Sequence, residues 1–183
     1  MRIRTSITDP LPIAEIPVPG TGGVIGMTYC PGKKDPHVKT GTWLRDLALD
    51  VAAIHGWGAE TVVTLLESHE IDLLEVQRLP QEVEARGMLW LHLPIRDGSI
   101  PEEAFELQWR AEERHIRGTL KRGGRVLVHC RGGLGRAGMV TARLLVESGM
   151  TAENAILAVR LVRERAIETL EQEAYVHRCQ RVG

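Results

Sequence analysis

The segment from Val126 to Gly138 combines residue types that suit chemistry on a phosphate group. An apolar run leads into Cys130, and five residues, three of them glycine, separate this cysteine from Arg136. Glycines let a loop curl until successive backbone N–H groups point inward, and a following helix N-terminus adds more N–H groups and a positive dipole end. The predicted phosphate-binding residues are Arg131, Gly132, Gly133, Leu134, Gly135 and Arg136.

Cys130 is the predicted nucleophile of this loop. Helix N-termini and nearby cations favour the thiolate form of cysteine, and Arg136 can offer two parallel N–H donors to two phosphate oxygens. The loop is not of the Walker A type, because the Gly-Lys-Ser/Thr ending is missing. The alternative is a buried structural cysteine beside a glycine-rich turn.

The elements that must position this loop alternate between strand and helix patterns. Such alternation predicts an α/β fold with a mainly parallel central sheet flanked by helices. Residues 1–23 are punctuated by proline and predicted to be extended, and residues 33–42 are polar and predicted to form a surface loop. The predicted strands are 24–29, 60–66, 88–93 and 125–129, and the predicted helices are 43–55, 101–121, 135–148, 152–164 and 170–180. Residues 73–83 suggest helical material, with Pro80 at a break or at a helix start. Capping boxes are predicted at Ser99/Glu102 and at Thr169/Gln172.

Asp97 is the candidate acid. It follows the predicted strand 88–93, and ligands in parallel sheets lie beyond the carboxyl ends of the strands, where Cys130 also falls. A carboxylic acid facing the nucleophile can protonate a leaving oxygen, and Gly98 would permit loop movement. The alternative is a turn aspartate, since Asp-Gly is a common turn pair.

Composition restricts the class of protein further. The 183 residues suit one domain, 1–183, with 43% hydrophobic and 26% charged residues. A formal charge of −1 excludes a basic field over the whole surface, so no nucleic-acid partner is expected. Three scattered cysteines predict no disulfide framework, and the histidines show no metal-ligand spacing. We expect a cytoplasmic monomer with no cofactor, no metal, no signal peptide and no membrane partner.

The string from His129 through Cys130 to Arg136 resembles the signature of cysteine-dependent protein phosphatases. The fuller string His-Cys-x-Gly-Gly-Leu-Gly-Arg is similar to the kinase-associated phosphatase branch of the dual-specificity group. Pro94-Ile95-x-Asp97-Gly98 also resembles that branch, as do Gly26, Pro31-Gly32 and the predicted helix Trp43–His55. The resemblance covers residues 20–180, specific at the loop and loose before residue 85. It implies a protein tyrosine phosphatase-like fold, a phosphocysteine intermediate and no metal.

The resemblance also implies roles for single residues. Asp97 would be the general acid and then the base, and Glu168 with Gln172 would act in the second step, where tyrosine-specific relatives use a Gln to orient water. Most relatives carry Ser or Thr after the arginine, where this chain has Ala137. That hydroxyl is understood to stabilise the thiolate, so its absence predicts slow hydrolysis of the intermediate.

The sequence therefore predicts a phosphatase for phosphotyrosine, phosphoserine and phosphothreonine in proteins or peptides. No segment resembles the loop with which deep-pocket tyrosine-specific enzymes grip the ring, which suggests a shallow pocket. Two alternatives stay open. One is a phosphate-binding module with little turnover, which Ala137 motivates, and the other is a phosphatase for a phosphoinositide or a small phosphoester.

Overall fold

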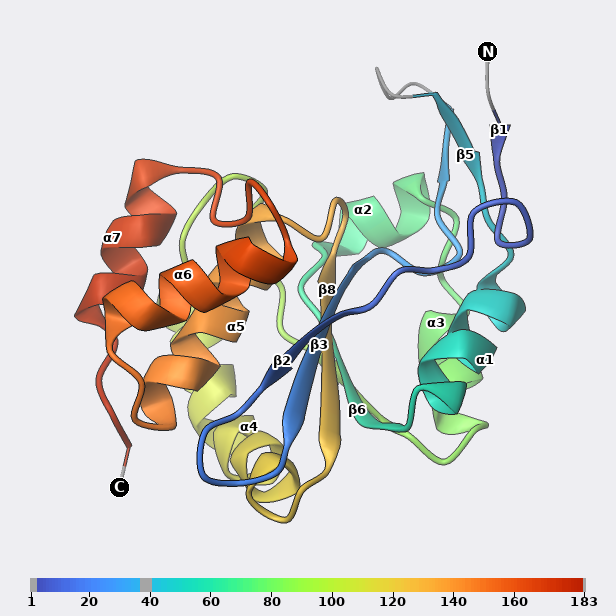
Figure 1. Ribbon diagram of the computed structural model, residues 1–183. Helices are drawn as coiled ribbons and strands as arrows, with labels where there is room; N and C mark the ends of the chain where they lie inside the picture. The colour runs from blue at the N-terminus through green and yellow to red at the C-terminus, as the bar shows by residue number, and fades with distance from the viewer. Residues whose placement is uncertain (1–2, 37–40, 183) are drawn as a thin grey trace.

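A five-stranded sheet runs through the centre of the protein, with helices on both faces (Figure 1). In this computed structural model, which describes residues 3–36 and 41–182, the strand order is β2-β3-β8-β6-β7. Only β2 and β3 pair antiparallel, so the predicted α/β fold with a mainly parallel sheet is confirmed. The strands are β2 (Ala14–Pro17), β3 (Val24–Tyr29), β6 (Ala59–Thr64), β7 (Leu89–His92) and β8 (Arg125–Cys130).

Two groups of helices cover the sheet (Figure 1). One face carries α1 (Leu47–Gly56), α2 (Ser68–Leu73) and α3 (Leu79–Glu84). The other face carries α4 (Glu103–Lys121), α5 (Gly135–Glu147), α6 (Ala152–Val162) and α7 (Leu170–Arg178). Among the described residues, no helix is both long and apolar enough to cross a bilayer.

The central strand β8 shows why the sheet needs both layers. Its side chains alternate, so that Val126 and Val128 join the core beneath α4 and α5, while Leu127 joins the core beneath α1 and α3. All three side chains are fully buried. A strand buried on both faces reads as a continuous apolar run, the pattern that predicted this strand from the sequence.

A small second sheet replaces part of the helix and the loop predicted near residue 43. It consists of β1 (Ile3–Arg4), β5 (Thr42–Leu44) and β4 (Lys34–Asp35), and the prediction for residues 37–40 falls outside the described residues. The predicted helix 43–55 was wrong at its start, because Trp43 pairs with Asp35 and packs its ring edge-on against Tyr29. The helix instead begins after Asp46, whose carboxylate accepts the N–H of Leu49 at 2.8 Å.

Two other helix ends refine the predictions. The Ser99/Glu102 capping box was wrong, since Glu102 is the N-cap of α4 and the N–H of Ser99 donates to the carbonyl of Arg96. Helix α4 therefore begins at Glu103, two residues after the predicted start at Pro101. At α7, Thr169 accepts the N–H of Gln172 at 3.1 Å, as predicted, but the Gln172 side chain reaches the N–H of Glu168 instead of that of Thr169.

A buried ion pair fastens this N-terminal region to the main sheet. Arg45 and Asp50 form two hydrogen bonds of 2.7 and 2.8 Å, and both side chains are almost fully buried. Asp50 also accepts the N–H of Gly32 at 2.8 Å, and Arg45 donates to the carbonyl of Asp9. The pair therefore positions the chain that leaves β3 toward the candidate site.

We expect Asp50→Ala to lower the free energy of unfolding by about 3–5 kcal/mol, because it leaves the buried guanidinium of Arg45 without its partner. Urea unfolding of both proteins measures the difference. Arg78→Ala is the matched control, since its exposed pair with Glu82 should contribute only about 0.5 kcal/mol. A loss in Asp50→Ala no larger than in this control would contradict the prediction.

Candidate functional site

Cys130 lies at the carboxyl end of β8, between β3 and β6. The residue is 3% exposed, and its sulfur accepts the N–H of Gly133 at 3.2 Å. Helix α5 starts at Gly135, directly after the loop, so its N-terminal N–H groups and dipole face this end of the sheet. The strand, glycine-rich loop and helix thus lie in the predicted order.

Gly133 is the position at which the loop requires glycine. Its φ angle is +67°, and a Cβ atom there would lie 2.5 Å from the backbone carbonyl group of Thr28 on β3. A side chain would therefore cause both backbone strain and a clash with backbone. With Gly133 packed this closely against Thr28, its N–H donates to the sulfur of Cys130.

Arg136 is almost fully buried and is held from several segments. Its guanidinium makes two bonds to Glu70 on α2, at 2.6 and 2.8 Å, and donates to the carbonyls of Ile95 and Leu65. Burial lowers the pKa of Arg136, but hydrogen bonding to Glu70 and the nearby Cys130 and Asp97 outweigh it and raise the pKa overall. The guanidinium is therefore a permanent, fixed cation beside Cys130.

Glu70 is the matching fixed anion. Burial raises the pKa of Glu70, but hydrogen bonds from Arg136 and from the backbone of Glu67 outweigh it, so the pKa is lowered overall. The Glu70 side chain is only 3% exposed, so solvent competes little with Arg136 for its carboxylate. Glu70 thus fixes which N–H groups of Arg136 remain available.

Asp97 reaches the loop from the segment after β7. Its carboxylate lies 2.9 Å from a terminal nitrogen of Arg136, and its side chain is 68% exposed. Gly98 has a φ angle of +71°, which favours glycine at this turn. The structure therefore brings together Cys130, Arg136 and Asp97, the three residues predicted to be catalytic, at one edge of the sheet.

The remaining loop residues are tied to groups outside the loop. The guanidinium of Arg131 binds the carboxylate of Asp35 on β4, at 2.8 and 3.0 Å. Glu168 accepts the N–H of Gly135 at 2.9 Å. Gln172 accepts the N–H of Glu168 and donates to the carbonyl of Ser99 at 3.3 Å. Gln172 therefore links the Glu168 segment to the segment that carries Asp97.

A hydrogen-bonded chain runs beneath the nucleophile. Trp90 donates to the hydroxyl of Thr64 at 2.9 Å, and that hydroxyl lies 2.8 Å from Nε2 of His129. Because the indole nitrogen only donates, the hydrogen of Thr64 is left for an unprotonated Nε2. Burial lowers the pKa of His129 to about 3, so the ring is neutral.

Three site residues were missed from the sequence: Glu70, Lys33 and Arg163. Lys33 was predicted to lie on a surface loop, yet it is only 5% exposed, and it donates to the carbonyl of Arg131. Arg163 donates to the carbonyls of Gly132 and Gly133. A charged residue in a polar or helical stretch normally indicates a solvated surface, so no local signal identified these three.

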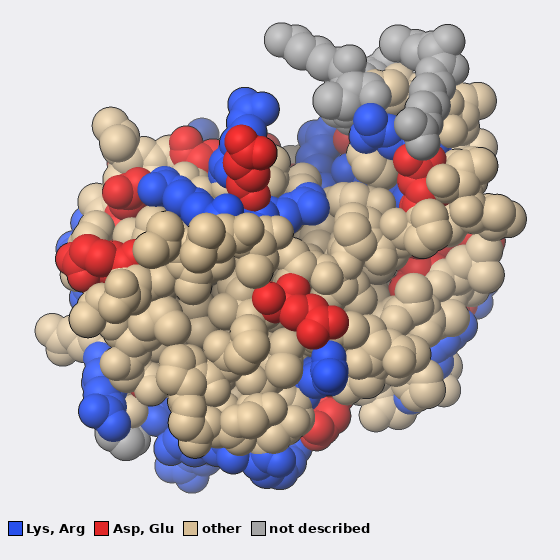
Figure 2. Space-filling model, in the orientation of Figure 1, with Lys and Arg blue, Asp and Glu red and all other residues tan. Residues whose placement is uncertain are grey.

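Charged residues surround the site without a continuous field of one sign. Figure 2 shows basic side chains along the upper edge of the face in view, the edge at which β3 and β8 end in Figure 1, with acidic side chains among them. Among the described residues, no group of three or more His, Cys, Asp or Glu side chains is placed to hold a metal ion.

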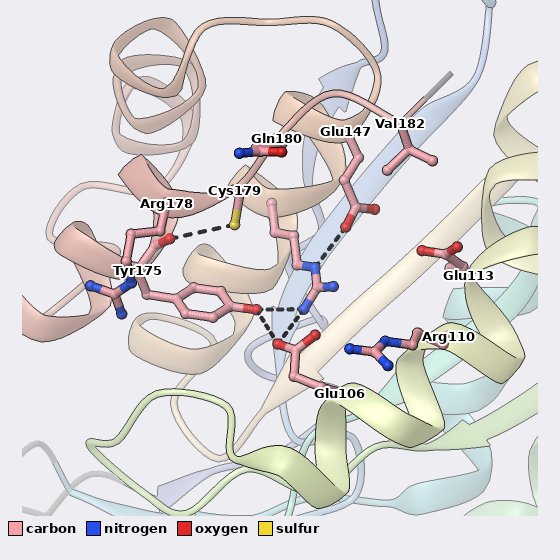
Figure 3. Close-up of a pocket in the computed structure, with 10 residues that line it drawn as sticks. Glu106, Arg110, Glu113, Glu147, Tyr175, Arg178, Cys179, Gln180 and Val182 are labelled. Atoms are coloured by element: carbon pink, nitrogen blue, oxygen red, sulfur yellow. Dashed lines mark hydrogen bonds and ion pairs between the residues drawn. The ribbon is translucent and has the colours of Figure 1, made fainter.

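A pocket of about 540 Å³ lies away from this site, between α4, α5 and α7. Figure 3 shows the hydroxyl of Tyr175 and the carboxylate of Glu106 approaching each other in it, with Cys179 above them in this view. Its lining includes a network in which Arg143 pairs with Glu106 and Glu147. Burial outweighs the nearby Arg143 and raises the pKa of Cys179 to about 11, which makes this thiol unreactive at neutral pH.

The sequence of this chain is similar to those of known phosphatases. The model of a family described as "Polymorphic toxin system, DSP-PTPase phosphatase" matches residues 45–150. The cyclin-dependent kinase inhibitor 3 of Rattus norvegicus is 30% identical over 156 residues, covering 84% of this chain and 70% of the relative. The human protein tyrosine phosphatase type IVA 3 is 33% identical over 113 residues, covering 62% of this chain and 60% of the relative.

Solved structures share the fold. Kinase associated phosphatase (KAP), crystallised with its catalytic site cysteine replaced by serine, has a TM-score of 0.80 and 26% identity. The match covers 92% of this chain and 93% of that one. Tk-PTP in its active form has a TM-score of 0.65 and 27% identity, covering 89% of this chain and 93% of that one.

We expect acid to destabilise the protein through His129. The ring has a pKa of about 3 when folded, against about 6.5 when unfolded, so the unfolded state binds more protons between these values. This contribution to stability is present near neutral pH and is lost as the pH falls below about 6.5, by an amount on the order of 2 kcal/mol near pH 4.5.

Urea unfolding near pH 7 and near pH 4.5 measures the loss of stability on acidification in the wild type and in His129→Gln. The variant should lose less stability on acidification, because no buried ring remains to be protonated. His55→Gln is the control, since His55 is exposed and should leave the acid loss unchanged. Equal acid losses in His129→Gln and the wild type would contradict the assignment.

Proposed function

This chain belongs to the dual-specificity and tyrosine phosphatase family, and on that premise we propose that it hydrolyses phosphotyrosine, phosphoserine and phosphothreonine in proteins through a phosphocysteine on Cys130. One observation carries the proposal most strongly. A buried thiol at a loop of inward N–H groups, a fixed arginine and an exposed carboxylate meet at one edge of the sheet. These are the groups that phosphoryl transfer to a thiolate requires.

In the proposed first step, the Cys130 thiolate attacks phosphorus and the bond to the leaving oxygen breaks. Asp97 gives its proton to that oxygen, so the product leaves as a neutral alcohol or phenol. The other phosphate oxygens are held by Arg136 and by loop N–H groups, which act as a pre-organised oxyanion site.

The hydrogen bonds of Arg136 suggest how a bound phosphate would release Asp97 from the arginine. Glu70 and two carbonyls occupy one terminal nitrogen, and Glu70 and Asp97 share the other. The buried Nε has no partner among the described residues. A phosphate would satisfy Nε and take the N–H group that now binds Asp97. Asp97 would then be free to face the leaving oxygen.

In the proposed second step, water attacks the phosphocysteine, Asp97 removes a proton from the water, and the thiolate leaves. We include Glu168 and Gln172 as residues that would orient the water. The carboxylate of Glu168 accepts a hydrogen bond from the N–H of Gly135, and the side-chain oxygen of Gln172 accepts one from the N–H of Glu168. No metal or other cofactor takes part in this scheme.

The proposal further describes a cytoplasmic monomer that acts on phosphorylated proteins or peptides. Three free cysteines suit a reducing compartment. Neither nucleic acid nor membrane is a partner in this proposal, because the formal charge is only −1 and the charges are mixed in sign.

A stopped-flow assay with p-nitrophenyl phosphate tests the chemistry. We expect a burst of one equivalent of p-nitrophenol followed by slow turnover, because Ala137 offers no hydroxyl to the departing thiolate. Cys130→Ser should show neither phase. Ala137→Ser should keep the burst and accelerate the steady rate by about tenfold.

Each other result has a definite meaning. Steady turnover without a burst would keep the phosphatase and remove the argument from Ala137. Activity that survives Cys130→Ser would eliminate the thiol mechanism. Absence of activity across the pH range would favour a phosphate-binding module.

A substrate panel tests the substrate class. The exposed position of Asp97 favours a shallow site, so peptides with phosphotyrosine, phosphoserine or phosphothreonine should all be hydrolysed. A soluble short-chain phosphoinositide should react at least about tenfold more slowly in kcat/KM. A preference for the phosphoinositide would replace the protein substrate with a lipid one.

A further inference from the structure

Two cations bind the outer side of the phosphate loop. Nζ of Lys33 donates to the carbonyl of Arg131 at 3.3 Å. Arg163, which follows α6, donates to the carbonyls of Gly133 and Gly132 at 3.0 and 3.1 Å. Three consecutive carbonyls of the loop are therefore held by positive charge, from two elements far apart in the sequence.

Because the peptide bond is planar, holding the loop carbonyls also fixes the direction of the loop N–H groups. In a trans peptide the carbonyl of one residue and the N–H of the next point in opposite directions. Holding the carbonyls of residues 131, 132 and 133 outward turns the N–H groups of residues 132, 133 and 134 inward. One peptide shows both ends: the carbonyl of Gly132 binds Arg163, and the N–H of Gly133 binds the sulfur of Cys130.

Both cations are fixed in place by their surroundings. Lys33 is 5% exposed, and its ammonium lies 4.2 Å from the centre of the Trp43 ring and 4.8 Å from that of Tyr29. Arg163 is partly buried. The ammonium and the guanidinium each interact electrostatically with Cys130. A thiolate on Cys130 would therefore form in the field of both.

The need for this charge follows from the few hydrogen bonds to the sulfur. Among the described residues, the N–H of Gly133 is the one donor within hydrogen-bond distance of Cys130 Sγ, and Ala137 offers no hydroxyl. The carbonyl of Arg131 has a second donor, the N–H of Cys30 at 3.3 Å. Loss of Lys33 would thus leave that peptide partly held while removing a charge.

We propose that Lys33 and Arg163 are positioning residues for the phosphatase reaction, which turn the loop N–H groups inward and stabilise the Cys130 thiolate by charge. This inference rests on the proposed role of Cys130 as the nucleophile. Neither residue touches the phosphate in the proposal; both act through the loop backbone and through their charge.

The ionisation of Lys33 would make the positive charge near the Cys130 sulfur depend on pH. Burial lowers the pKa of Lys33 to about 8, although Cys30, Asp35 and Cys130 act in the opposite direction. As the pH rises through about 8, the ammonium loses its proton, and with it the charge beside the sulfur. The titratable and charged groups around it are Cys30 and Tyr29 on the β3 side, Asp35 on β4, Arg45 with Asp50, and Cys130 and Arg131 on the loop.

The test measures the ionisation of Cys130 without requiring turnover. Alkylation by iodoacetamide is followed against pH, with peptide mass mapping to separate Cys130 from the other cysteines. We expect Lys33→Met and Arg163→Met each to move the alkylation midpoint upward by about one pH unit. Each should also lower kcat/KM for p-nitrophenyl phosphate by about tenfold. Lys34→Met and Arg165→Met are the matched controls, since both side chains lie outside the loop contacts, and their midpoints should not move.

Conservative variants separate charge from packing. Lys33→Arg and Arg163→Lys each keep a cation, so each should return the alkylation midpoint from that of the methionine variant toward that of the wild type. If the methionine variants do not fold, Lys33→Gln and Arg163→Gln replace them. These variants keep an N–H donor and remove the charge, so their alkylation midpoints should also move upward.

Midpoints of both uncharged variants equal to that of the wild type would overturn the proposal. Shifted midpoints in a protein that lacks turnover would support the two positioning roles while refuting the proposed hydrolysis. Failure of the proposed function is therefore distinguishable from failure of this inference.

Discussion

The buried ion pair between Arg136 and Glu70 is the interaction on which the candidate site depends. A guanidinium removed from water is tolerated only when its charge and its donors are compensated. Glu70 supplies the charge, and carbonyls of Leu65 and Ile95 fill other donors, so the first turn of α5 is joined to α2, to the end of β6 and to the segment after β7. The same contacts leave the buried Nε without a partner among the described residues, while one terminal nitrogen binds both Glu70 and the exposed Asp97.

The sheet gives the site a rigid side and a less constrained side. Cys130 ends the central strand, buried on both faces, so the nucleophile is anchored through the hydrogen bonds of β3 and β6. Asp97 follows β7, an edge strand of the five-stranded sheet that pairs with β6, and the Asp97 side chain is mostly exposed. A fixed nucleophile and an acid on a less constrained segment suit a reaction in which the acid must move between the arginine and the leaving oxygen.

The loop could be predicted from sequence because its signals are local: an apolar strand, closely spaced glycines and a helix start occur within thirteen residues. Glu70, Lys33 and Arg163 carry no such signal, since each becomes buried only through contacts between distant segments. The helical spacing of apolar residues from Leu44 to Ile54 predicted a helix that starts at residue 43. Pairing with β4 and packing on Tyr29 instead decide the conformation of Trp43. Local propensity failed where tertiary contacts outweighed it.

Both cations that bind the loop carbonyls lie outside residues 45–150, the region matched by the family model. Lys33 follows Gly32, whose N–H is bound by Asp50, and Asp50 is itself bound by Arg45. A continuous series of buried polar contacts therefore runs from the small N-terminal sheet to the carbonyl of Arg131. Arg163 reaches the other side of the same loop from the end of α6. The peptide that presents the N–H of Gly133 to Cys130 is thus held by a segment after the Cys130–Arg136 motif, and the neighbouring carbonyl by one before it. The motif alone would therefore not define the shape or the charge of the candidate site.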